Sequence, residues 1–405
     1  MSGPLSGVRV LDVSRAIAGP CGAMILGDLG AEIIKIEAPE GDISRFSAGP
    51  TYKGENFFYM AFNRNKKDIV LDLGAKLGKE AFLDLVKISD VVLDNLRAGS
   101  MDRLGAGYSD LKKINPRIIC CTITGYGETG PSKDRPAYDV VLLAASGLLS
   151  LSREPEGPPI RPAAPIGDMV GGLLADIGIL AALKEREHTG KGQKISISLL
   201  DACISLLSYQ FSEYFLSGVV PKPLSHSGHL VSVPYGIYKT KDGYLAIGSS
   251  WPRIARAINA EWLIDDPRFK DPKARREHRD ELNAIVEEHL AEASAEDWLN
   301  IFEAEDIPAD RVKTLDEVAS DPQVAHQKMI LKMEHILGGD IKLVGNPIKS
   351  ASISEENFTP PPVINQHEQE VLVNLLGYSE EKIKALREEE RNHTLERQKH
   401  VRKVF

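Results

Sequence analysis

The chain has 405 residues, of which 42% are hydrophobic and 26% charged, a composition typical of a globular protein long enough for two domains. Its formal net charge is −9, and acidic and basic residues are interleaved, which argues against a general nucleic-acid-binding surface. The sequence begins without the charged and apolar regions of a signal peptide, and we find no apolar run of the roughly 18 residues that a membrane helix needs. We therefore expect a soluble, cytoplasmic protein with no nucleic-acid or membrane partner.

Four cysteines occur in the chain, at spacings that fit neither a zinc site nor a disulfide framework. Two of them, Cys120 and Cys121, are adjacent within a strand-like run. We expect all four, including Cys21 and Cys203, to be buried, reduced thiols, and we expect no metal site.

Short β-branched runs alternate with helical runs over the first 124 residues. This alternation predicts an α/β fold with a doubly wound, mostly parallel, Rossmann-like sheet. Such sheets bind ligands beyond the carboxyl ends of their strands, so the loops at those ends are the candidate site. The expected strands are 8–14, 31–39, 68–73, 90–96 and 117–124, and the expected helices are 20–30, 78–89, a short one near 101–105 and one near 111–116.

A long apolar helix is expected after Asp168, ending at Gly190, followed by a strand over 193–200 and a helix over 201–218. Pro, Gly and Ser then mark a linker, and a hairpin turning at Asp242-Gly243 opens a smaller α+β domain with charged helices. A helical C-terminal pattern could return to the first sheet. The expected divisions are 1–205 for the N-terminal part of the large domain, 206–232 for a connecting helix and linker, 233–325 for the small domain, and 326–405 for a linker and the returning C-terminal segment.

The stretch Gly125-Tyr-Gly-Glu-Thr-Gly130 satisfies the G-x-G-x-x-G pattern of dinucleotide-binding turns. That fingerprint needs a helix N-terminus to hold a pyrophosphate. Pro131 and Pro136 follow within a few residues, so no helix can start cleanly there. We expect a glycine-rich loop at the edge of a ligand site, and an NAD-linked oxidoreductase is disfavoured.

The first 187 residues contain no histidine. A site on the first sheet therefore has no local imidazole for a Ser-His-Asp triad or a histidine metal cluster. A carboxylate becomes the leading candidate for nucleophile or base.

Asp168 is the candidate carboxylate, in the stretch PIGDMVGG. Asp is also a favoured helix N-cap, which offers a purely structural role. The capping-box partner is missing, and Gly171 and Gly172 are poor helix formers, which suggests that a ligand approaches the backbone closely there.

Several segments in a fixed order resemble the class III CoA-transferases, of the formyl-CoA and carnitine CoA-transferase type. The resemblance covers nearly the whole chain and is strongest over residues 6–205. The segments are GVRVLDVSRAIAGP, GDLGAEIIKIEAPEGD, FNRNKKDIVLDL, DVVLDNLRAGSMDRLG, GYGETGP, AYD, GDMVGG and HTGKGQKISISLLDA.

The resemblance implies that Asp168 is the catalytic nucleophile, which forms a mixed anhydride and then an aspartyl-CoA thioester. The backbone of Ile17 and Ala18 is similar to the family segment that faces this nucleophile and supports an oxyanion. Formyl-CoA members carry Gln at position 17, so Ile17 makes a small polar acid a doubtful substrate. Tyr138 and Asp139 match the position of substrate or nucleophile support.

The same resemblance implies a CoA site. Leu71 and Leu73 would border the adenine, Asn95 and Leu96 the pantetheine, and Arg103 the phosphates. Formyl-CoA enzymes have lysines where this chain has Gly74 and Ala137, so other cations must help; the candidates are Lys66, Lys67 and Arg97. CoA thioesters would be substrates, and no tightly bound cofactor and no metal is implied.

Two other functions remain open at this stage. An α-methylacyl-CoA racemase has the same fold but uses a histidine where this chain has Tyr138, and a neutral tyrosine is a poor acid-base substitute at pH 7. A non-catalytic CoA-binding protein would have no need of the retained Gly167-Asp168 pair. Family members form interlocked homodimers, and we expect a homodimer here.

Overall fold

The computed structural model describes residues 3–404, and it divides into two compact units. The larger unit combines residues 3–142, 164–205 and 323–404, and the second combines 143–163 and 206–322. Residues 206–232, expected to form a connecting segment, belong to the second unit.

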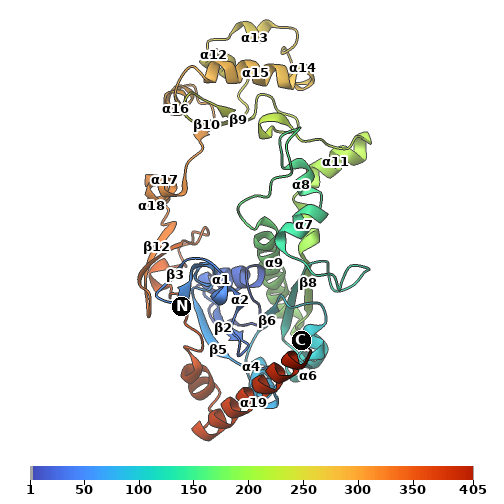
Figure 1. Cartoon of the computed structure of the whole chain (residues 1–405), viewed down its shortest axis with the longest axis vertical. Coiled ribbons are helices and arrows are strands. Elements are labelled where there is room, and N and C mark those ends of the chain that lie inside the picture. The colour runs from blue at the N-terminus through green and yellow to red at the C-terminus, as the bar shows by residue number, and fades with distance from the viewer. Residues whose placement is uncertain (1–2, 405) are drawn as a thin grey trace. The chain divides into compact units, whose positions relative to one another are not determined.

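The larger unit is built on a six-stranded sheet in which all neighbouring strands are parallel (Figure 1). The strand order is β5-β2-β1-β6-β7-β8, so the chain proceeds outward in one direction from β1 and then returns to fill the other side from β6. The expected α/β fold with a mostly parallel sheet is confirmed. The strands are β1 (Arg9–Asp12), β2 (Glu32–Glu37), β5 (Lys66–Val70), β6 (Val91–Asp94), β7 (Ile119–Thr124) and β8 (Lys194–Ser198).

Helices follow most of these strands and bury apolar faces against the sheet, because parallel strands are buried on both sides. The helix near 111–116 and the short one near 101–105 are present as α6 and α5. The helices of this part are α1 (Ala18–Asp28), α2 (Ile43–Phe46), α3 (Phe57–Ala61), α4 (Lys76–Lys87), α5 (Ser100–Arg103), α6 (Tyr108–Ile114), α7 (Asp139–Ala145), α9 (Ile166–Thr189) and α10 (Leu199–Ser205).

Helix α9 ends as the sequence predicted, because Gly190 takes the left-handed conformation with φ of 69°. Its 24 residues have a mean hydropathy of 1.8 over an 18-residue window, so by length and composition it could cross a membrane. The expectation that the chain has no such helix is therefore wrong, since Asp168 and Asp176 interrupt the apolar run without ending it. In the structure α9 packs against α1, α10, β7 and β8 mainly through small residues such as Gly171, Gly172 and Ala175, whereas Leu173 and Ile177 are 44% and 62% exposed.

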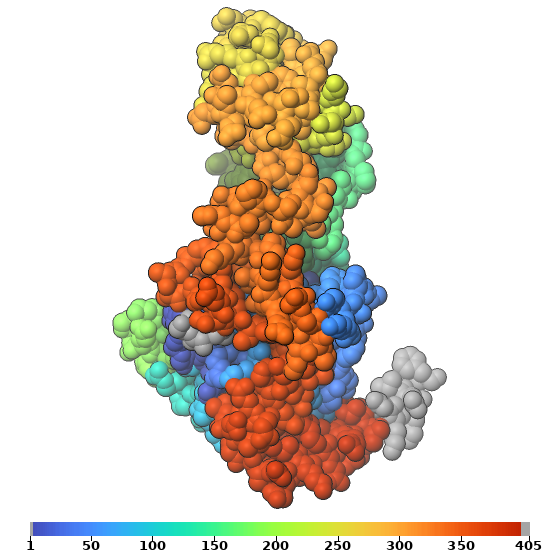
Figure 2. All heavy atoms as spheres, turned by 90° about the vertical axis from the view of Figure 1, so that its left-hand side faces the viewer, coloured from blue at the N-terminus to red at the C-terminus, as the bar shows by residue number. Residues whose placement is uncertain are grey.

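The C-terminal residues belong to the larger unit. Val371, Leu372 and Leu386 join the same apolar core as Leu85 of α4, and α19 packs beside α4 (Figure 1). Figure 2 shows this segment, in orange and red, spread over one face of the unit. The elements are α18 (Pro322–His326), the antiparallel hairpin of β12 (Ile330–His335) and β13 (Gly339–Val344), the 3-10 turn Glu355–Asn357, the π-helix Gln369–Leu375 and α19 (Glu380–Val404), with the small hairpin β3 (Thr51–Tyr52) and β4 (Glu55–Asn56) completing the unit.

The second unit has its own core around Tyr238, Phe269 and Phe302. The predicted hairpin at Asp242-Gly243 is confirmed as an antiparallel pair, with a third strand added beside it. The helix expected over 201–218 is broken into α10 and α11. The elements of the second unit are α8 (Leu148–Leu151), α11 (Ser208–Ser217), the 3-10 turn Ser225–Ser227, β9 (Gly236–Lys239), β10 (Tyr244–Ile247), α12 (Arg253–Ala257), α13 (Trp262–Asp265), α14 (Pro272–Glu277), α15 (Arg279–Leu290), α16 (Ala295–Ala304), β11 (Ala309–Arg311) and α17 (Leu315–Ser320).

Candidate active site

A cavity of about 500 Å³ opens within the larger unit, at the carboxyl ends of β1, β6 and β7. The direction in which the chain adds strands to the sheet reverses between β1 and β6, and the loops that follow these two strands diverge there. Ligands of open α/β sheets bind at such a switch point. The cavity is lined by most of the residues that the sequence singled out: Ile17, Ala18, Asn95, Leu96, Arg103, Tyr138 and Asp168.

Asp168 lies on the wall of this cavity, in the first turn of α9. The helix begins at Ile166 with Pro165 as its N-cap, so Asp168 is the third helical residue. The interpretation of Asp168 as a helix N-cap is therefore wrong. The positive end of the helix dipole favours a negative charge at this position.

The capping role belongs instead to Asp139, which is buried at the start of α7. Its Oδ1 accepts hydrogen bonds from the amides of Gly167 (2.8 Å) and Asp168 (3.3 Å). A carboxylate thus satisfies two amides that the helix itself leaves open. Asp139 fixes the first turn of α9 and with it the backbone of Asp168.

Two glycines of α9 admit neighbouring helices: Gly172 admits α1 and Gly171 admits Leu199 of α10. A Cβ atom on Gly172 would lie 2.5 Å from the carbonyl oxygen of Ala18, and one on Gly171 would lie 2.2 Å from Leu199 Cδ2. The expectation that these glycines make room for a ligand is wrong, because protein atoms fill that space. Residues four apart share a helix face, so the contact of Gly172 with Ala18 places Asp168, one turn earlier, near the start of α1.

The loop between β1 and α1 faces the cavity with Arg15, Ala16, Ile17 and Ala18. The first hydrogen bond of α1 runs from the Cys21 amide to the Ile17 carbonyl (2.8 Å), and no side chain of the described residues caps this helix. Amides in the first turn of a helix have no acceptor within the helix. The predicted oxyanion donors, the amides of Ile17 and Ala18, are thus at the positive end of α1.

The predicted CoA contacts fall in two adjoining hollows. Asn95, Leu96 and Arg103 line the main cavity, whereas Leu71 and Leu73 line a smaller one of about 200 Å³. Arg15 and Leu96 border both hollows, so the two hollows are neighbours. Leu71 is only 1% exposed and belongs mainly to the core, so Leu73 offers the larger surface to a ligand.

Two of the three additional cations proposed from the sequence are wrongly placed. Lys66 is fully buried, burial lowers its pKa to about 8, and its ammonium binds Asp12 (2.9 Å) and the Pro20 carbonyl (2.9 Å). Lys67 pairs with Glu32 at the amino ends of β2 and β5, whereas the cavity lies at the carboxyl ends of the strands. Neither can reach a phosphate in the cavity.

Arg97 does line the cavity, and three further cations join it. Arg15 belongs to the loop already singled out, while Lys133 and Arg135 follow the glycine-rich loop. These three residues were not predicted as cations of the site, although their position after β1 and β7 was a usable signal. The guanidinium of Arg135 lies 5.0 Å from the ring centre of Tyr126, which holds it over that loop.

The glycine-rich loop edges the cavity through Gly125, and no helix begins until Asp139. The expectation that no helix starts directly after this loop is therefore confirmed. Gly125 itself is needed for packing, because a Cβ there would lie 2.3 Å from the Cβ of Ala137.

The described residues can be compared with the ligand sets of metal sites and with the surroundings of reactive thiols. No group of three or more His, Cys, Asp or Glu side chains among them could hold a metal ion. The four cysteines are buried and free, as predicted. Burial, together with the charges of Asp139 and Asp168, raises the pKa of the Cys203 thiol to about 11, which keeps it protonated near neutral pH.

The sequence matches the model of CoA-transferase family III over residues 5–368. The chain belongs to this family. It is 36% identical to succinyl-CoA:glutarate CoA-transferase of Mus musculus over 95% of this chain and 89% of that protein. It is 35% identical to acetyl-CoA:oxalate CoA-transferase of Acetobacter aceti over 88% of this chain and 92% of that protein.

Among solved structures, the chain resembles a CaiB/BaiF family protein from Brucella suis with a TM-score of 0.82 and 31% identity. The match covers 93% of this chain and all of that one. The family III assignment thus agrees in sequence and in fold, and the resemblance inferred from the sequence is confirmed.

Proposed function

We propose that this family III member transfers coenzyme A from an acyl-CoA to a carboxylic acid, with Asp168 as the covalent relay. One observation supports this most directly. Asp168 lies on the wall of the switch-point cavity, on the helix turn that approaches the open amides at the start of α1. A carboxylate nucleophile and two preorganised amide donors are the groups that acyl exchange requires.

The proposed reaction has four acyl-transfer steps. The Asp168 carboxylate attacks the donor thioester, giving an aspartyl mixed anhydride and a free CoA thiolate. The thiolate attacks the aspartyl carbonyl, giving aspartyl-CoA thioester and releasing the donor acid as a carboxylate. The acceptor carboxylate then attacks this thioester to form a second mixed anhydride, and the thiolate attacks its acceptor carbonyl, which regenerates Asp168. Every step exchanges one thiolate or carboxylate for another, so no oxidant, metal or net proton is required.

Each step passes through a tetrahedral oxyanion. The amides of Ile17 and Ala18 would stabilise it, because they point from the positive end of α1 and have no acceptor within the helix. Removing one such donor typically raises the activation barrier by about 3–4 kcal/mol. The buried Asp139 would act only through the backbone of Asp168.

CoA would lie along the two adjoining hollows. Arg103 and Arg97 would bind its phosphates, Asn95 and Leu96 would border the pantetheine, and Leu73, with the more buried Leu71, would border the adenine. Tyr138, whose side chain is 77% exposed, would contact the acyl group at the mouth of the cavity. CoA thioesters are then substrates and not resident cofactors.

The acid is proposed to be larger or less polar than formate. Position 17 has an isoleucine, and Ile43, Ile123 and Leu199 add apolar surface to the cavity. The cations Lys133 and Arg135 offer partners for a second carboxylate. Dicarboxylates of the succinate and glutarate size, which the mouse relative's name includes, are therefore the first acids to test.

An α-methylacyl-CoA racemase is disfavoured by the composition of the cavity. Its lining, in the part of the chain that the structure describes, includes no histidine, and position 138 is a tyrosine. Deuterium entering the α-carbon from solvent would indicate the racemase instead.

A homodimer in the cytoplasm is proposed for the assembly. Apolar side chains of α11 and the segment after it are exposed in the second unit, including Phe215 (74%) and Leu216 (89%). A second copy of the chain would cover them. Light scattering should give twice the monomer mass, and a monomeric mass at micromolar concentration would contradict the dimer.

The decisive experiment is covalent trapping on Asp168. Incubation with succinyl-CoA, followed by digestion and mass spectrometry, should find CoA attached to the peptide that contains Asp168. Asp168→Asn should show no adduct and no exchange, while it folds and binds CoA. Asp134 is a second carboxylate on the same cavity, and the matched variant Asp134→Asn should show both the CoA adduct and CoA exchange. Exchange at the wild-type rate by Asp168→Asn would refute the proposal.

A further inference from the structure

The loop between β1 and α1 has a strained backbone. Ala16 takes φ of 65°, in the left-handed region that residues other than glycine rarely adopt. The next two residues provide the amides proposed to stabilise the oxyanion. A non-glycine residue keeps this conformation only when its surroundings determine it, so the groups that hold Ala16 are of functional interest.

One side of the loop is held by a buried ion pair. The Ala16 amide donates to Asp42 Oδ1 (3.2 Å), and Asp42 Oδ2 accepts from Lys35 Nζ (3.0 Å). The same ammonium donates to the Ser14 carbonyl (2.9 Å). Lys35 is 0% exposed and Asp42 3% exposed. Two backbone groups of the loop thus bind the two members of one buried pair.

The other side is held by an amide side chain. Asn95 Oδ1 accepts from the Arg15 amide (2.9 Å), and Asn95 Nδ2 donates to the Arg15 carbonyl (2.7 Å). Asn95 follows β6, whereas Asp42 follows β2, so the loop is clamped from both neighbours of β1. The side chain of Asn95 is therefore engaged with protein and acts on a ligand mainly through the loop.

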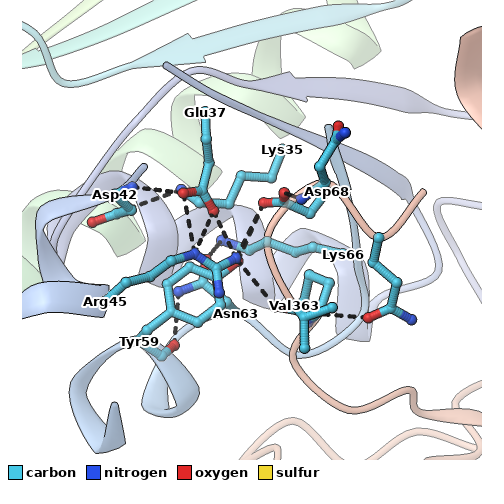
Figure 3. Close-up of polar contacts among 12 residues, drawn as sticks. Lys35, Glu37, Asp42, Arg45, Tyr59, Asn63, Lys66, Asp68 and Val363 are labelled. Atoms are coloured by element: carbon cyan, nitrogen blue, oxygen red, sulfur yellow. Dashed lines mark hydrogen bonds and ion pairs between the residues drawn. The ribbon is translucent and has the colours of Figure 1, made fainter. Parts of the chain in front are cut away.

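Asp42 is anchored in a larger cluster of buried charges (Figure 3). Its amide donates to Glu37 Oε2 (2.6 Å), and Glu37 in turn pairs with Arg45 (2.8 Å). Burial opposes ionisation of Asp42, but Lys35 and the Ser44 amide outweigh it and lower the pKa to about 2. The acceptor for Ala16 is therefore a carboxylate at neutral pH.

We propose that Asp42 and Asn95 are positioning residues for acyl transfer. They hold the backbone of Arg15 and Ala16 so that the next two amides, those of Ile17 and Ala18, point at the acyl carbonyl bonded to Asp168. The inference rests on the proposed function. Neither residue needs to touch the reacting atoms, because both act through the backbone. Loss of either clamp lets Ala16 relax to negative φ, and the two amides then turn away.

The test compares three variants in single-turnover acylation of Asp168 by succinyl-CoA. Asp42→Ala and Asn95→Ala should each slow adduct formation and kcat about 10- to 100-fold, the range for lost oxyanion donors or a misplacement near 1 Å. The Kd of CoA should change less than about threefold in Asp42→Ala. Asp68→Asn is the matched control, since Asp68 is an equally buried carboxylate of the same cluster that contacts Arg45 and not the loop; its kcat should stay within about twofold.

A rescue separates positioning from general damage to the fold. Glycine populates positive φ without steric penalty. Adding Ala16→Gly to Asp42→Ala should therefore recover several-fold in kcat relative to Asp42→Ala alone. If Asp42→Ala does not fold, Asn95→Ala and its combination with Ala16→Gly give the same comparison.

The outcomes are distinct. Wild-type acylation rates in folded Asp42→Ala and Asn95→Ala would overturn the positioning role, as would absence of any glycine rescue. A wild-type protein that never forms the adduct would overturn the proposed function itself.

Discussion

Replacing Gly172 by alanine tests whether the close approach of α1 and α9 builds the site. The new Cβ would lie 2.5 Å from the backbone oxygen of Ala18, and a normal contact needs about 3.4 Å. The obstacle is backbone and cannot rotate away. Helix α1 must therefore move by close to 1 Å relative to Asp168.

Two effects on stability partly cancel. Overpacking in a close-packed core costs about 1–3 kcal/mol, and replacing glycine by alanine in a helix gains about 1 kcal/mol. Gly172→Ala should thus lose between zero and about 2 kcal/mol of unfolding free energy. Activity should suffer more, because a displacement of 1 Å in a catalytic constellation can reduce the rate about 100-fold.

The assay is steady-state CoA exchange between succinyl-CoA and a panel of acids, with denaturant unfolding of the same samples. Gly178→Ala is the control, since this glycine lies on the same helix and its Cβ would meet only the movable Ile195 side chain at 3.1 Å. The control should keep near-wild-type kcat and stability. Wild-type turnover by Gly172→Ala would refute the argument that this contact sets the geometry.

Three further outcomes are expected. Asp139→Ala should lower unfolding free energy by about 1 kcal/mol and reduce kcat more than it alters KM, because two amides of α9 lose their acceptor; an unchanged kcat would contradict this. Arg103→Ala should raise the KM for acyl-CoA about 10-fold or more, whereas Lys67→Ala should leave it unchanged; the reverse ranking would reject the proposed phosphate site. Burial raises the pKa of Asp94 to about 6, so in the folded state it holds a proton that the unfolded chain releases near pH 4, and stability should fall as pH rises from 4 to 6. Asp94→Asn should remove that slope and add up to about 3 kcal/mol at pH 7, as measured by urea unfolding across pH; an unaltered slope would contradict the assignment.

The structure changes the role of several residues without changing the proposed chemistry. Asn95 is engaged with the loop backbone, and Asp139 caps the helix on which Asp168 lies. Lys66 holds the start of α1 through the Pro20 carbonyl instead of a phosphate. Polar residues near the cavity thus serve mostly to fix its backbone.

The sequence by itself determined the parallel α/β sheet, the long helix after Asp168, the absence of a dinucleotide turn and the family. These features depend on local periodicity, on Gly and Pro positions and on the order of short motifs, all of which can be read along the chain. The absence of histidine before residue 188 favoured a carboxylate, and the family resemblance pointed to Asp168 as the candidate nucleophile.

Only the tertiary structure decided what Gly172, Lys66, Asp42 and Asn95 contact. A glycine is equally consistent with room for a ligand and with room for a neighbouring helix, and the distinction depends on Ala18, which is 154 positions away in the chain. The residues around a lysine in a strand do not show where in the sheet the lysine lies or which buried carboxylate it pairs with. Such contacts arise from the crossing of distant segments, and no local propensity encodes them.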